Sequence, residues 1–353
     1  MNTANKTSPK ISVIIPAYNV EEYIGAMLDC VLSQTMHDYE VIVVNDGSTD
    51  GTGSIIADYK EKFPLFTCIT QTNKGLSAAR NAAMAVAKGE YCAFLDADDL
   101  ITDDYLEKLY NACVQEQAEL VKCSISDFTD AVESAWLVSD AGSRMLVFDN
   151  DLSCSAQNSP CAGIVSKSFL DRNNILFSVG EQMEDSPYGL AVNLLANKTA
   201  VVKESLYFHR VGRSQSIMTK VRQGREDPRI PYKGMRNTAE LLKKNIPDLV
   251  DGSVAEYLVA NTFACFLTTM YKNYGKTVRK ELCSYCYSYF DEFFPDFYKN
   301  KYVLQRGTKL PVNLPLVQKT AVRLFAVSYR LHCLYCFSWC SAKILKILDA
   351  VSK

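Results

Sequence analysis

The chain has 353 residues, of which 48% are hydrophobic, and its formal net charge is −2 at pH 7. This length predicts about two domains, and the apolar content is sufficient for a sizeable core. The near-zero charge argues against a nucleic-acid-binding protein, which usually carries a basic surface. The polar N-terminus lacks the apolar segment of a signal peptide, and no run of about 18 apolar residues predicts a transmembrane helix. We therefore expect a cytoplasmic protein.

The 13 cysteines are scattered and lack the regular spacing of a disulfide-rich secreted domain. The nearest metal-like spacing joins Cys333 and Cys336, but these two residues lie among Leu, Tyr and Phe. A structural zinc site needs further converging thiolates or imidazoles, so we expect reduced and mostly buried thiols instead.

The first 125 residues alternate predicted strands and helices. Short apolar runs predict buried parallel strands at residues 11–15, 40–44, 67–70, 91–95 and 119–123. Apolar residues at helical spacing, or alanine-rich composition, predict helices around residues 24–32, 55–59, 76–87 and 106–113. This alternation predicts an α/β doubly wound, mostly parallel sheet.

Local signals predict where several of these elements begin and end. Pro16 is expected to end the first strand, and Thr102 is expected to cap the fourth helix. Asn19 is expected to cap the first helix, with Glu22 as its capping-box partner.

The second half of the chain changes character. Residues 124–160 are predicted to be irregular, and short helices are expected near 165–170 and 187–196. Beyond about residue 220 helical spacing dominates. We therefore expect one domain over residues 1–220 and a mainly helical C-terminal domain over residues 221–353.

Polar residues follow three of the predicted strands, at the edge where doubly wound sheets bind ligands: Asn19, Asp46 and Asp96. Asp96-Ala97-Asp98-Asp99 comes directly after an apolar strand. Two carboxylates at i and i+2 can face one hard cation such as Mg²⁺ or Mn²⁺, which takes oxygen ligands and often shares them with phosphates. A solvated acidic turn is the alternative interpretation, and the position of the segment after a buried strand disfavours it.

Asp46 opens the segment Asp46-Gly47-Ser48-Thr49-Asp50 after the second strand. Its carboxylate could accept a hydrogen bond from the imide N–H of a uracil, or hold a ribose hydroxyl. The alternative is a helix N-cap turn. Both interpretations hold together if Ser48, Thr49 or Asp50 caps the helix while Asp46 contacts the ligand.

The segment from Asn73 to Asn81 joins a strand to a helix. Gly75 would allow close approach of the backbone to a ligand. The planar guanidinium of Arg80 suits a diphosphate or base contact, although on its own it could equally be a surface charge.

These segments, in this order, resemble those of family-two glycosyltransferases of the GT-A fold. The matching motifs are Pro16-Ala17-Tyr18-Asn19, Asp46-Gly47-Ser48-Thr49-Asp50, the G-x-x-x-A-R-N helix start Gly75 to Asn81, and the D-x-D of Asp96-Ala97-Asp98. The resemblance is close over residues 10–125 and looser to about residue 218. It implies a Rossmann-like GT-A fold, a nucleotide-sugar donor that is usually uridine-based, and inversion at the anomeric carbon.

The resemblance also implies roles for individual residues. The donor would contact Pro16, Ala17, Tyr18, Asn19, Asp46, Asn73, Lys74, Gly75, Arg80, Asp96 and Ala97. Mn²⁺ or Mg²⁺ would be held by Asp98, with Asp96 acting through a water or the ribose.

Glu184-Asp185-Ser186-Pro187 resembles the Glu-Asp pair that supplies the general base in this family. Asp185 is expected to deprotonate the acceptor hydroxyl, with Glu184 as the second candidate. Pro187 suits the first turn of a helix, so an ordinary pair of helix-start acids is the alternative interpretation.

Tyr207-Phe208-His209-Arg210 resembles an aromatic strand of these relatives, which a loop ending near Ser216 follows. The resemblance implies that Arg210 and Ser216 hold the leaving diphosphate. His209 is either a structural residue or a ligand of the metal or phosphate.

Residues 320–350 interleave basic and aromatic side chains. This pattern favours either a helix at a membrane surface, on the inner face of the cytoplasmic membrane, or a helix packed on the catalytic domain or on a second subunit.

The sequence therefore favours an inverting glycosyltransferase that transfers one sugar from a nucleotide-diphosphate sugar to a glycan or lipid-linked acceptor, in bacterial capsule, lipopolysaccharide or exopolysaccharide assembly. Processive synthases carry a Q-x-x-R-W segment and transmembrane helices, and neither is found. A nucleotidyltransferase should carry a Gly-rich basic loop after the first strand, and a dehydrogenase should carry G-x-G-x-x-G there. Pro16-Ala17-Tyr18-Asn19 stands at that position instead, which disfavours both classes. A catalytically silent nucleotide-sugar-binding scaffold is the non-enzymatic alternative.

Overall fold

The computed structural model describes residues 8–129, 158–212, 231–245, 252–270, 273–304 and 314–341. The chain divides into two compact units. The first contains the described residues up to 129 together with Asn158–Gly180 and Ala196–Val211. The second contains Glu181–Leu195 and the described residues after 212. The predicted domain boundary near residue 220 lies outside the described residues and stays a prediction.

The first unit is built on a sheet whose strands lie, over the described residues, in the order β3-β2-β1-β4-β7-β6-β8-β5. The strands are β1 Ile11–Ala17, β2 Tyr39–Asn45, β3 Phe66–Thr70, β4 Tyr91–Phe94, β5 Leu100–Ile101, β6 Leu120–Phe128, β7 Gly163–Ser166 and β8 Thr199–Arg210. The pairs β1–β2, β1–β4, β2–β3 and β6–β8 are parallel, and β7 and β5 pair with their neighbours in antiparallel fashion. The predicted doubly wound, mostly parallel sheet is therefore confirmed.

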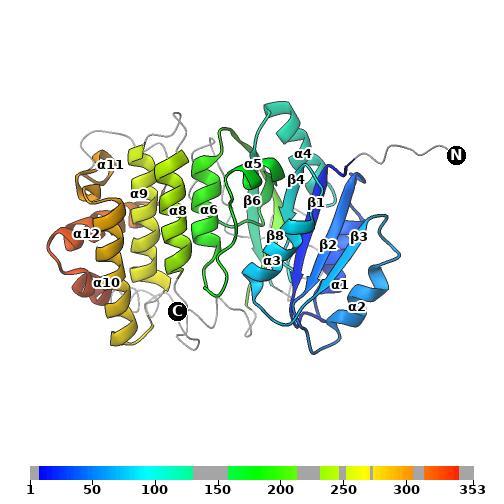
Figure 1. The fold of residues 1–353 in the computed structure, drawn as a ribbon, viewed down its shortest axis with the longest axis horizontal. Helices are drawn as coiled ribbons and strands as arrows, with labels where there is room; N and C mark the ends of the chain where they lie inside the picture. The colour runs from blue at the N-terminus through cyan, green and yellow to red at the C-terminus, as the bar shows by residue number, and fades with distance from the viewer. Residues whose placement is uncertain are drawn as a thin grey trace. The chain divides into compact units, whose positions relative to one another are not determined.

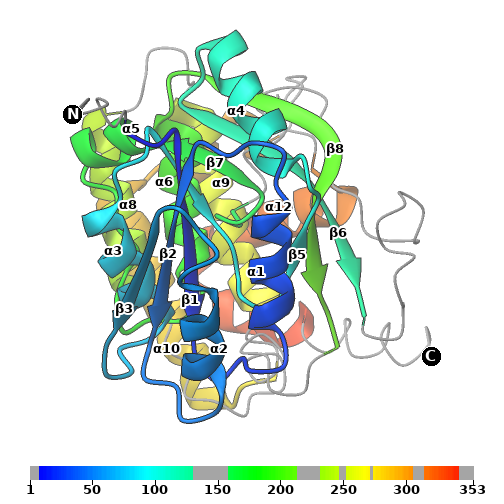
Figure 2. The ribbon, with the colours of Figure 1, turned by 90° about the vertical axis from the view of Figure 1, so that its right-hand side faces the viewer.

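Helices cover both faces of this sheet. They are α1 Ile24–Leu32, α2 Thr52–Tyr59, α3 Leu76–Val86, α4 Tyr105–Glu116 and α5 Lys167–Arg172. Figure 2 shows α1 and α2 on one face and α3 and α5 on the other. Because successive strand side chains point to opposite faces, Val13 and Ile15 of β1 pack into one core cluster with Leu28 and Val31 of α1.

The strand β8 does not match β6 residue for residue. The register shifts between Cys123 and Ser124 and again between Ser124 and Ile125. As a result, Cys123 lies opposite Val202 while Ile125 lies opposite Tyr207. A β-bulge or a related irregularity of the pairing produces such a shift, and it re-aims the side chains that follow.

Three of the predicted element ends are wrong. β1 continues through Pro16, whose missing N–H breaks no bond to β4 because that pairing ends at Ile14. The first helix begins at Ile24 and not at Asn19, whose φ of 50° belongs to the left-handed region. The fourth helix begins at Tyr105 after Asp104, whose carboxylate accepts a hydrogen bond from the Thr102 hydroxyl at 2.7 Å.

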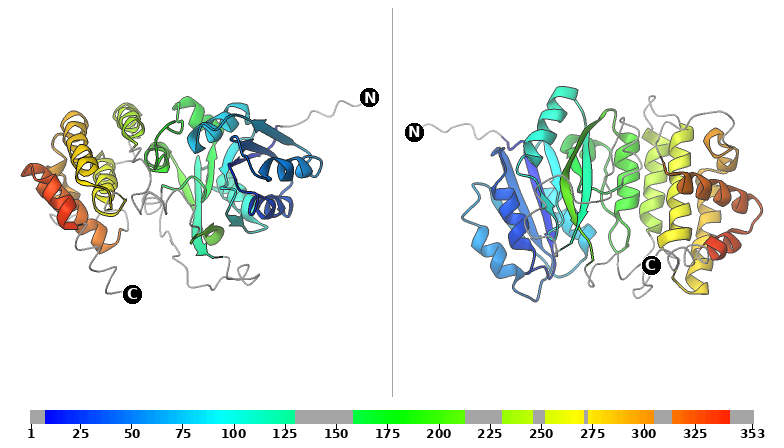
Figure 3. Two further views of the ribbon diagram at one scale, coloured as in Figure 1. Left: turned by 90° about the horizontal axis from the view of Figure 1, so that it is seen from below. Right: turned by 180° about the vertical axis from the view of Figure 1, so that it is seen from behind.

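The second unit is helical wherever it is described. Its elements are α6 Asp185–Leu195, α8 Tyr232–Asn245, α9 Gly252–Cys265, the π-helical turn η3 Phe266–Met270, α10 Lys276–Phe293, the 3₁₀ turn η4 Phe297–Lys299, α11 Lys301–Leu304 and α12 Leu316–Arg330. Figure 1 shows α6, α8 and α9 side by side, and Figure 3 shows α12 beside α9 in further views.

Aromatic rings fill the core of the helical unit. Phe290 of α10 lies 5.3 Å from Phe263, 4.2 Å from Phe297 and 5.4 Å from Phe325, measured between ring centroids. Such contacts tie α9, α10, η4 and α12 into one core. No helix within the described ranges is both long enough and apolar enough to span a bilayer.

A substitution at Gly47 tests whether the loop after β2 requires glycine. Its φ is 76°, and a Cβ placed there would lie 2.7 Å from the backbone nitrogen of Asn73. We expect Gly47→Ala to lower the free energy of unfolding by about 1–3 kcal/mol, from backbone strain and the clash together. The measurement is a urea unfolding curve followed by circular dichroism.

The matched control is Gly25→Ala, inside α1. There a Cβ meets only the Tyr59 hydroxyl at 3.9 Å, and the backbone is not left-handed. Alanine is the better helix former by about 1 kcal/mol, so this variant should be as stable as the parent or more stable. Equal stability of the Gly47→Ala variant and the parent would show that the loop relaxes freely.

Candidate functional site

The carboxyl ends of β1, β2 and β4 meet at one edge of the sheet because the three strands run parallel. Asn19, Asp46 and Asp96 follow these strands, as the sequence predicts. Doubly wound sheets bind ligands at this edge, so it is the candidate site.

The loops after β1 and β2 are joined by two hydrogen bonds. The backbone N–H of Asn19 donates to the Ser48 hydroxyl at 3.1 Å, and the backbone N–H of Thr49 donates to the Asn19 side-chain oxygen at 2.8 Å. Asn19 therefore holds the neighbouring loop in place of capping a helix. In the same motif Pro16 and Ala17 are buried within β1, whereas Tyr18 is 48% exposed at the edge.

Asp46 ties the end of β2 to the start of α3. Its carboxylate is 3% exposed and accepts from the Lys74 N–H at 2.9 Å, the Gly75 N–H at 2.8 Å and the Gln71 side-chain amide at 2.7 Å. A carboxylate has about four acceptor positions, so three are used inside the protein. The remaining acceptor position is on Oδ2.

Gly75 is the N-cap residue that precedes α3, and its φ is 87°. A Cβ added there would meet nothing within 4 Å. Glycine is thus favoured here by the left-handed backbone rather than by close approach of another part of the chain.

Arg80 lies behind the acidic turn and not on the surface. It is 2% exposed, and its guanidinium donates to Asp96 Oδ1 at 2.7 Å while lying 5.0 Å from the Phe177 ring centroid. The Asp96 side chain is 34% exposed, so this ion pair is only partly shielded from water. In this geometry Arg80 orients Asp96 and neutralises part of its charge.

Asp99 is the buried centre of the acidic turn. It is 2% exposed and accepts from the Tyr207 hydroxyl at 2.5 Å and from the Arg210 N–H at 2.7 Å. Burial, together with the nearby carboxylates of Asp98 and Asp96, raises the pKa of Asp99, against the lowering effect of these two hydrogen bonds. Sequence reasoning missed this role, since Tyr207 and Asp99 are far apart in the chain.

Arg210 reaches the same turn by its side chain. Its Nε donates to the Asp98 backbone oxygen at 2.6 Å, and its guanidinium lies 4.8 Å from the Tyr23 ring centroid and 4.5 Å from that of Phe128. The two rings and the carbonyl hold the cation beside the predicted metal-binding residues. Arg210 thus lies beside Asp98, and its predicted contact with the leaving diphosphate stays a prediction.

His209, the predicted third metal-binding residue, is exposed on β8. Its Nδ1 lies 3.0 Å from Asp127 Oδ1. Over the described ranges there is no group of three or more His, Cys, Asp or Glu side chains that could hold a metal ion. His209, Asp98 and Asp96 thus do not form a ready three-ligand site within the protein.

Glu184 and Asp185 belong to the second unit, where Asp185 is the first residue of α6. Both residues are half-buried, and the Tyr188 N–H donates to the Glu184 backbone oxygen at 3.4 Å. The expected helix start at this pair is observed, and its role as a base stays a prediction. Ser216 lies outside the described residues.

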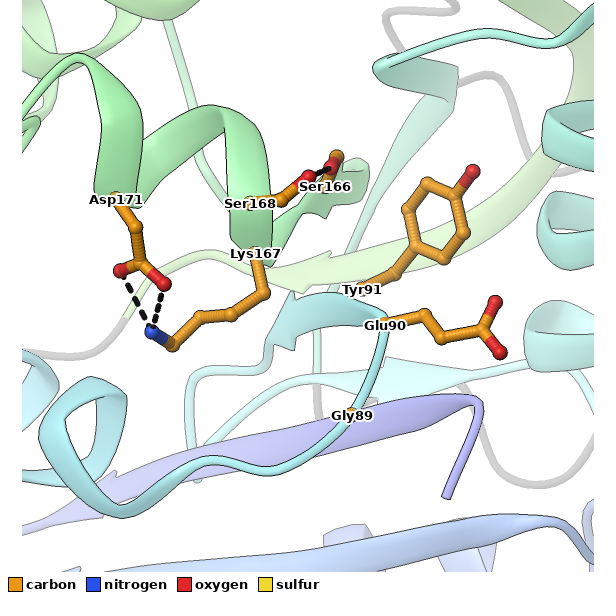
Figure 4. A pocket seen from close by; sticks show the side chains of 7 residues that line it. All are labelled: Gly89, Glu90, Tyr91, Ser166, Lys167, Ser168 and Asp171. Carbon is orange, nitrogen blue, oxygen red and sulfur yellow. Dashed lines mark hydrogen bonds and ion pairs between the residues drawn. The ribbon is translucent and has the colours of Figure 1, made fainter. Parts of the chain in front are cut away.

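A shallow pocket of about 450 Å³ lies at the opposite end of β4 (Figure 4). Lys167 and Asp171 form an i, i+4 ion pair at its wall, with Glu90 and Tyr91 close by. β4 begins at Tyr91 and ends at Phe94, so this pocket is remote from the acidic turn. Lys167, the one basic residue among its lining residues, is paired with Asp171, and we assign the pocket no function.

Solved structures of other proteins share the fold of this chain. S. aureus TarS, over its residues 1–349 and in complex with UDP, superimposes with a TM-score of 0.65 at 20% identity, covering 92% of each chain. The chain thus has the GT-A fold, with a helical region after it.

Residues 12–170 match the family described as Glycosyl transferase family 2. This part of the chain is therefore a family-two glycosyltransferase domain. Glycosyltransferase GlyA of Streptococcus pneumoniae is 34% identical over 213 residues, which is 57% of this chain and 30% of GlyA. The poly(ribitol-phosphate) beta-glucosyltransferase of Bacillus spizizenii is 30% identical over 215 residues, 60% of this chain and 33% of that protein. The chain thus spans about a third of each of these two relatives.

Asp99 provides a test of the turn. In Asp99→Ala, the buried Tyr207 hydroxyl and the Arg210 N–H lose their shared acceptor, which we expect to lower the free energy of unfolding by about 2–4 kcal/mol. Asp58→Ala removes an exposed carboxylate of α2 and should change it by less than about 0.5 kcal/mol. Chemical denaturation of both variants measures the difference. Similar small effects in both variants would contradict the bridging role of Asp99.

Proposed function

We propose that the chain transfers one sugar, with inversion, from a nucleotide-diphosphate sugar to an acceptor hydroxyl, with the help of a divalent metal ion. The observation that carries this proposal is the acidic turn at the ligand-binding edge of a family-two domain. Within that turn Asp99 is used to hold β8, and Asp96 pairs with Arg80. The Asp98 carboxylate is half-buried at the same edge.

Asp98 and Asp96 suit Mn²⁺ or Mg²⁺. These cations take oxygen ligands, and Mg²⁺ sites usually contain one or two carboxylates completed by substrate phosphates and water. A turn with two partly accessible carboxylates, Asp98 and the second oxygen of Asp96, fits that description. The bound cation would supply charge for the leaving diphosphate. His209 suits this hard cation less well than a carboxylate does, because Mg²⁺ and Mn²⁺ prefer oxygen ligands to imidazole nitrogen. Its Nδ1 already contacts Asp127, so Nε2 is the ring nitrogen that could reach a ligand.

A uridine diphosphate donor is the best supported class. TarS, which shares the fold, has been crystallised with UDP and with UDP-GlcNAc. The remaining acceptor position of Asp46 Oδ2 would receive a base or ribose donor, beside Tyr18, Asn19 and Asn73. Lys74 and Gly75 would line the phosphate side, where the start of α3 offers backbone N–H groups.

Asp185 would act as the general base. It would take the proton of the acceptor hydroxyl while the acceptor oxygen attacks the anomeric carbon and the bond to the diphosphate oxygen breaks. Arg210, held beside Asp98, and Lys74 would stabilise the negative charge that develops on the diphosphate. Ser216 would join them, and Glu184 is the second candidate for the base.

The name of one relative supports an acceptor class. One of them acts on poly(ribitol-phosphate) by its name, which supports a glycan or lipid-linked acceptor in bacterial surface-polysaccharide assembly. Capsule, lipopolysaccharide and exopolysaccharide remain alternatives within this class. We also propose a homo-oligomer, a cytoplasmic location and a peripheral membrane contact through residues 320–350. Of these residues, 342–350 lie outside the described part of the chain.

Two variants separate metal and donor binding from proton transfer. We expect Asp98→Ala to weaken Mn²⁺-dependent binding of UDP at least tenfold in calorimetry, because the cation loses its main protein ligand. Asp185→Asn should bind UDP like the parent but turn over about 10²–10⁴ times more slowly, the usual contribution of a general base. Turnover is measured as release of nucleoside diphosphate from a panel of nucleotide sugars, with and without EDTA.

The control is Asp58→Asn, which removes an exposed charge remote from the edge and should match the parent in both assays. Binding of UDP without release from any donor or acceptor tested would favour the silent scaffold. Failure of every nucleoside diphosphate to bind would contradict both the transferase and the scaffold.

A further inference from the structure

The charges of the C-terminal region are strongly segregated. Residues 297–348 contain nine Lys and Arg and no Asp or Glu, although the whole chain has a net charge of −2. The remainder of the chain is therefore acidic. A segment this basic seeks an anionic partner, and the reaction proposed above does not require it.

Helix α12 exposes an apolar face to solvent. Leu316 is 75% exposed, Val317 73%, Leu324 52%, Val327 55% and Leu331, the residue after the helix, 67%. At 3.6 residues per turn these five side chains fall within an arc of about 100°. Exposed apolar residues gathered on one arc, rather than scattered singly, make this face a candidate binding surface.

Other side chains of α12 pack the helix against the rest of the helical unit. Val322, Phe325, Ala326 and Tyr329 are buried against α9, η4 and α11. They occupy a different arc from the exposed apolar residues. The exposed face is thus not needed to hold α12 on the helical unit.

A row of basic side chains borders the apolar face. Lys319, Arg323 and Arg330 are spaced four and seven residues apart, so they lie on one line along α12, between the exposed apolar arc and the buried one. Within the described residues none of the three forms an ion pair with a carboxylate. Their stems are long enough to extend a charge past the apolar residues.

We propose that α12 lies on the surface of a membrane that carries anionic headgroups. Its apolar face would enter the boundary between headgroups and acyl chains, and Lys319, Arg323 and Arg330 would contact the lipid phosphates. An apolar arc bordered by cations matches this surface, which offers both kinds of contact at one depth.

A second copy of the chain fits this face less well. In a two-fold interface each patch meets its own copy, so the basic row would face a second basic row. Residues 297–348 contain no carboxylate to neutralise that repulsion. The membrane occupant is therefore the one that the charges favour.

The test is flotation of the full chain with vesicles of phosphatidylcholine alone and with phosphatidylglycerol added. We expect binding to the anionic vesicles only, weakened by high salt. Lys319→Gln with Arg330→Gln should lower the partition coefficient by more than about tenfold, since each basic residue near such a surface contributes several-fold. Leu324→Gln with Val327→Gln should lower it similarly, because the apolar contact is lost.

The matched control is Lys60→Gln with Lys203→Gln, which removes two exposed charges from the first unit and leaves the net charge equal to that of the basic-row variant. It should bind like the parent. The proposal would be overturned if the control lost as much vesicle binding as the Lys319→Gln, Arg330→Gln variant, or if the parent bound neutral and anionic vesicles equally. A monomer produced by Leu324→Gln with Val327→Gln from a dimeric parent, with vesicle binding unchanged, would also overturn it.

The four substituted residues of α12 are exposed or half-buried, so the unfolding midpoints should be those of the parent. The experiment uses no donor or metal. Failure to bind vesicles would thus leave the proposed sugar transfer standing, and a failed transfer assay would leave membrane binding standing.

Discussion

The buried carboxylate of Asp99 is the constraint on which the acidic turn depends. It joins the loop after β4 to β8 through the Tyr207 hydroxyl and the Arg210 N–H. The same stretch of β8 sends the Arg210 side chain to the Asp98 carbonyl. A change in the position of β8 would therefore move the backbone of the turn and the cation beside it together. Such coupling keeps charged groups in place before a ligand arrives, which is what electrostatic stabilisation of a leaving group requires.

Most polar groups at this edge bind other parts of the protein. Asp46 holds the start of α3, Asn19 holds the loop after β2, and Arg80 holds Asp96 from behind. Each of these interactions uses hydrogen-bonding positions that a ligand could otherwise occupy. Asp98, Asp96 and Tyr18 remain partly exposed at this edge. A site built in this way is pre-organised by its supporting hydrogen bonds.

The sheet and the edge could be predicted from the sequence, because apolar runs and the polar residues that end them are local signals. The partners of those polar residues could not be predicted. Arg80 is indistinguishable from a surface arginine until Cys161 and Phe177 pack against it. Tyr207 is brought to Asp99 by the pairing of β5 with β8. Helix α6, which apolar spacing predicts near residues 187–196, packs with α8 and α9. Periodicity predicts that a helix forms and not which neighbour covers it.

The bulged pairing of β6 and β8 makes the length of β8 as important as its composition. Two steps along β6, from Cys123 to Ile125, match five steps along β8, from Val202 to Tyr207. Side chains alternate between the faces of a sheet, so this odd surplus reverses the facing of every residue after it. Loss of one residue from this stretch would turn Tyr207 away from Asp99, although each residue type was retained. Natural variation in this strand should therefore occur by substitution, and changes of length should occur in steps of two.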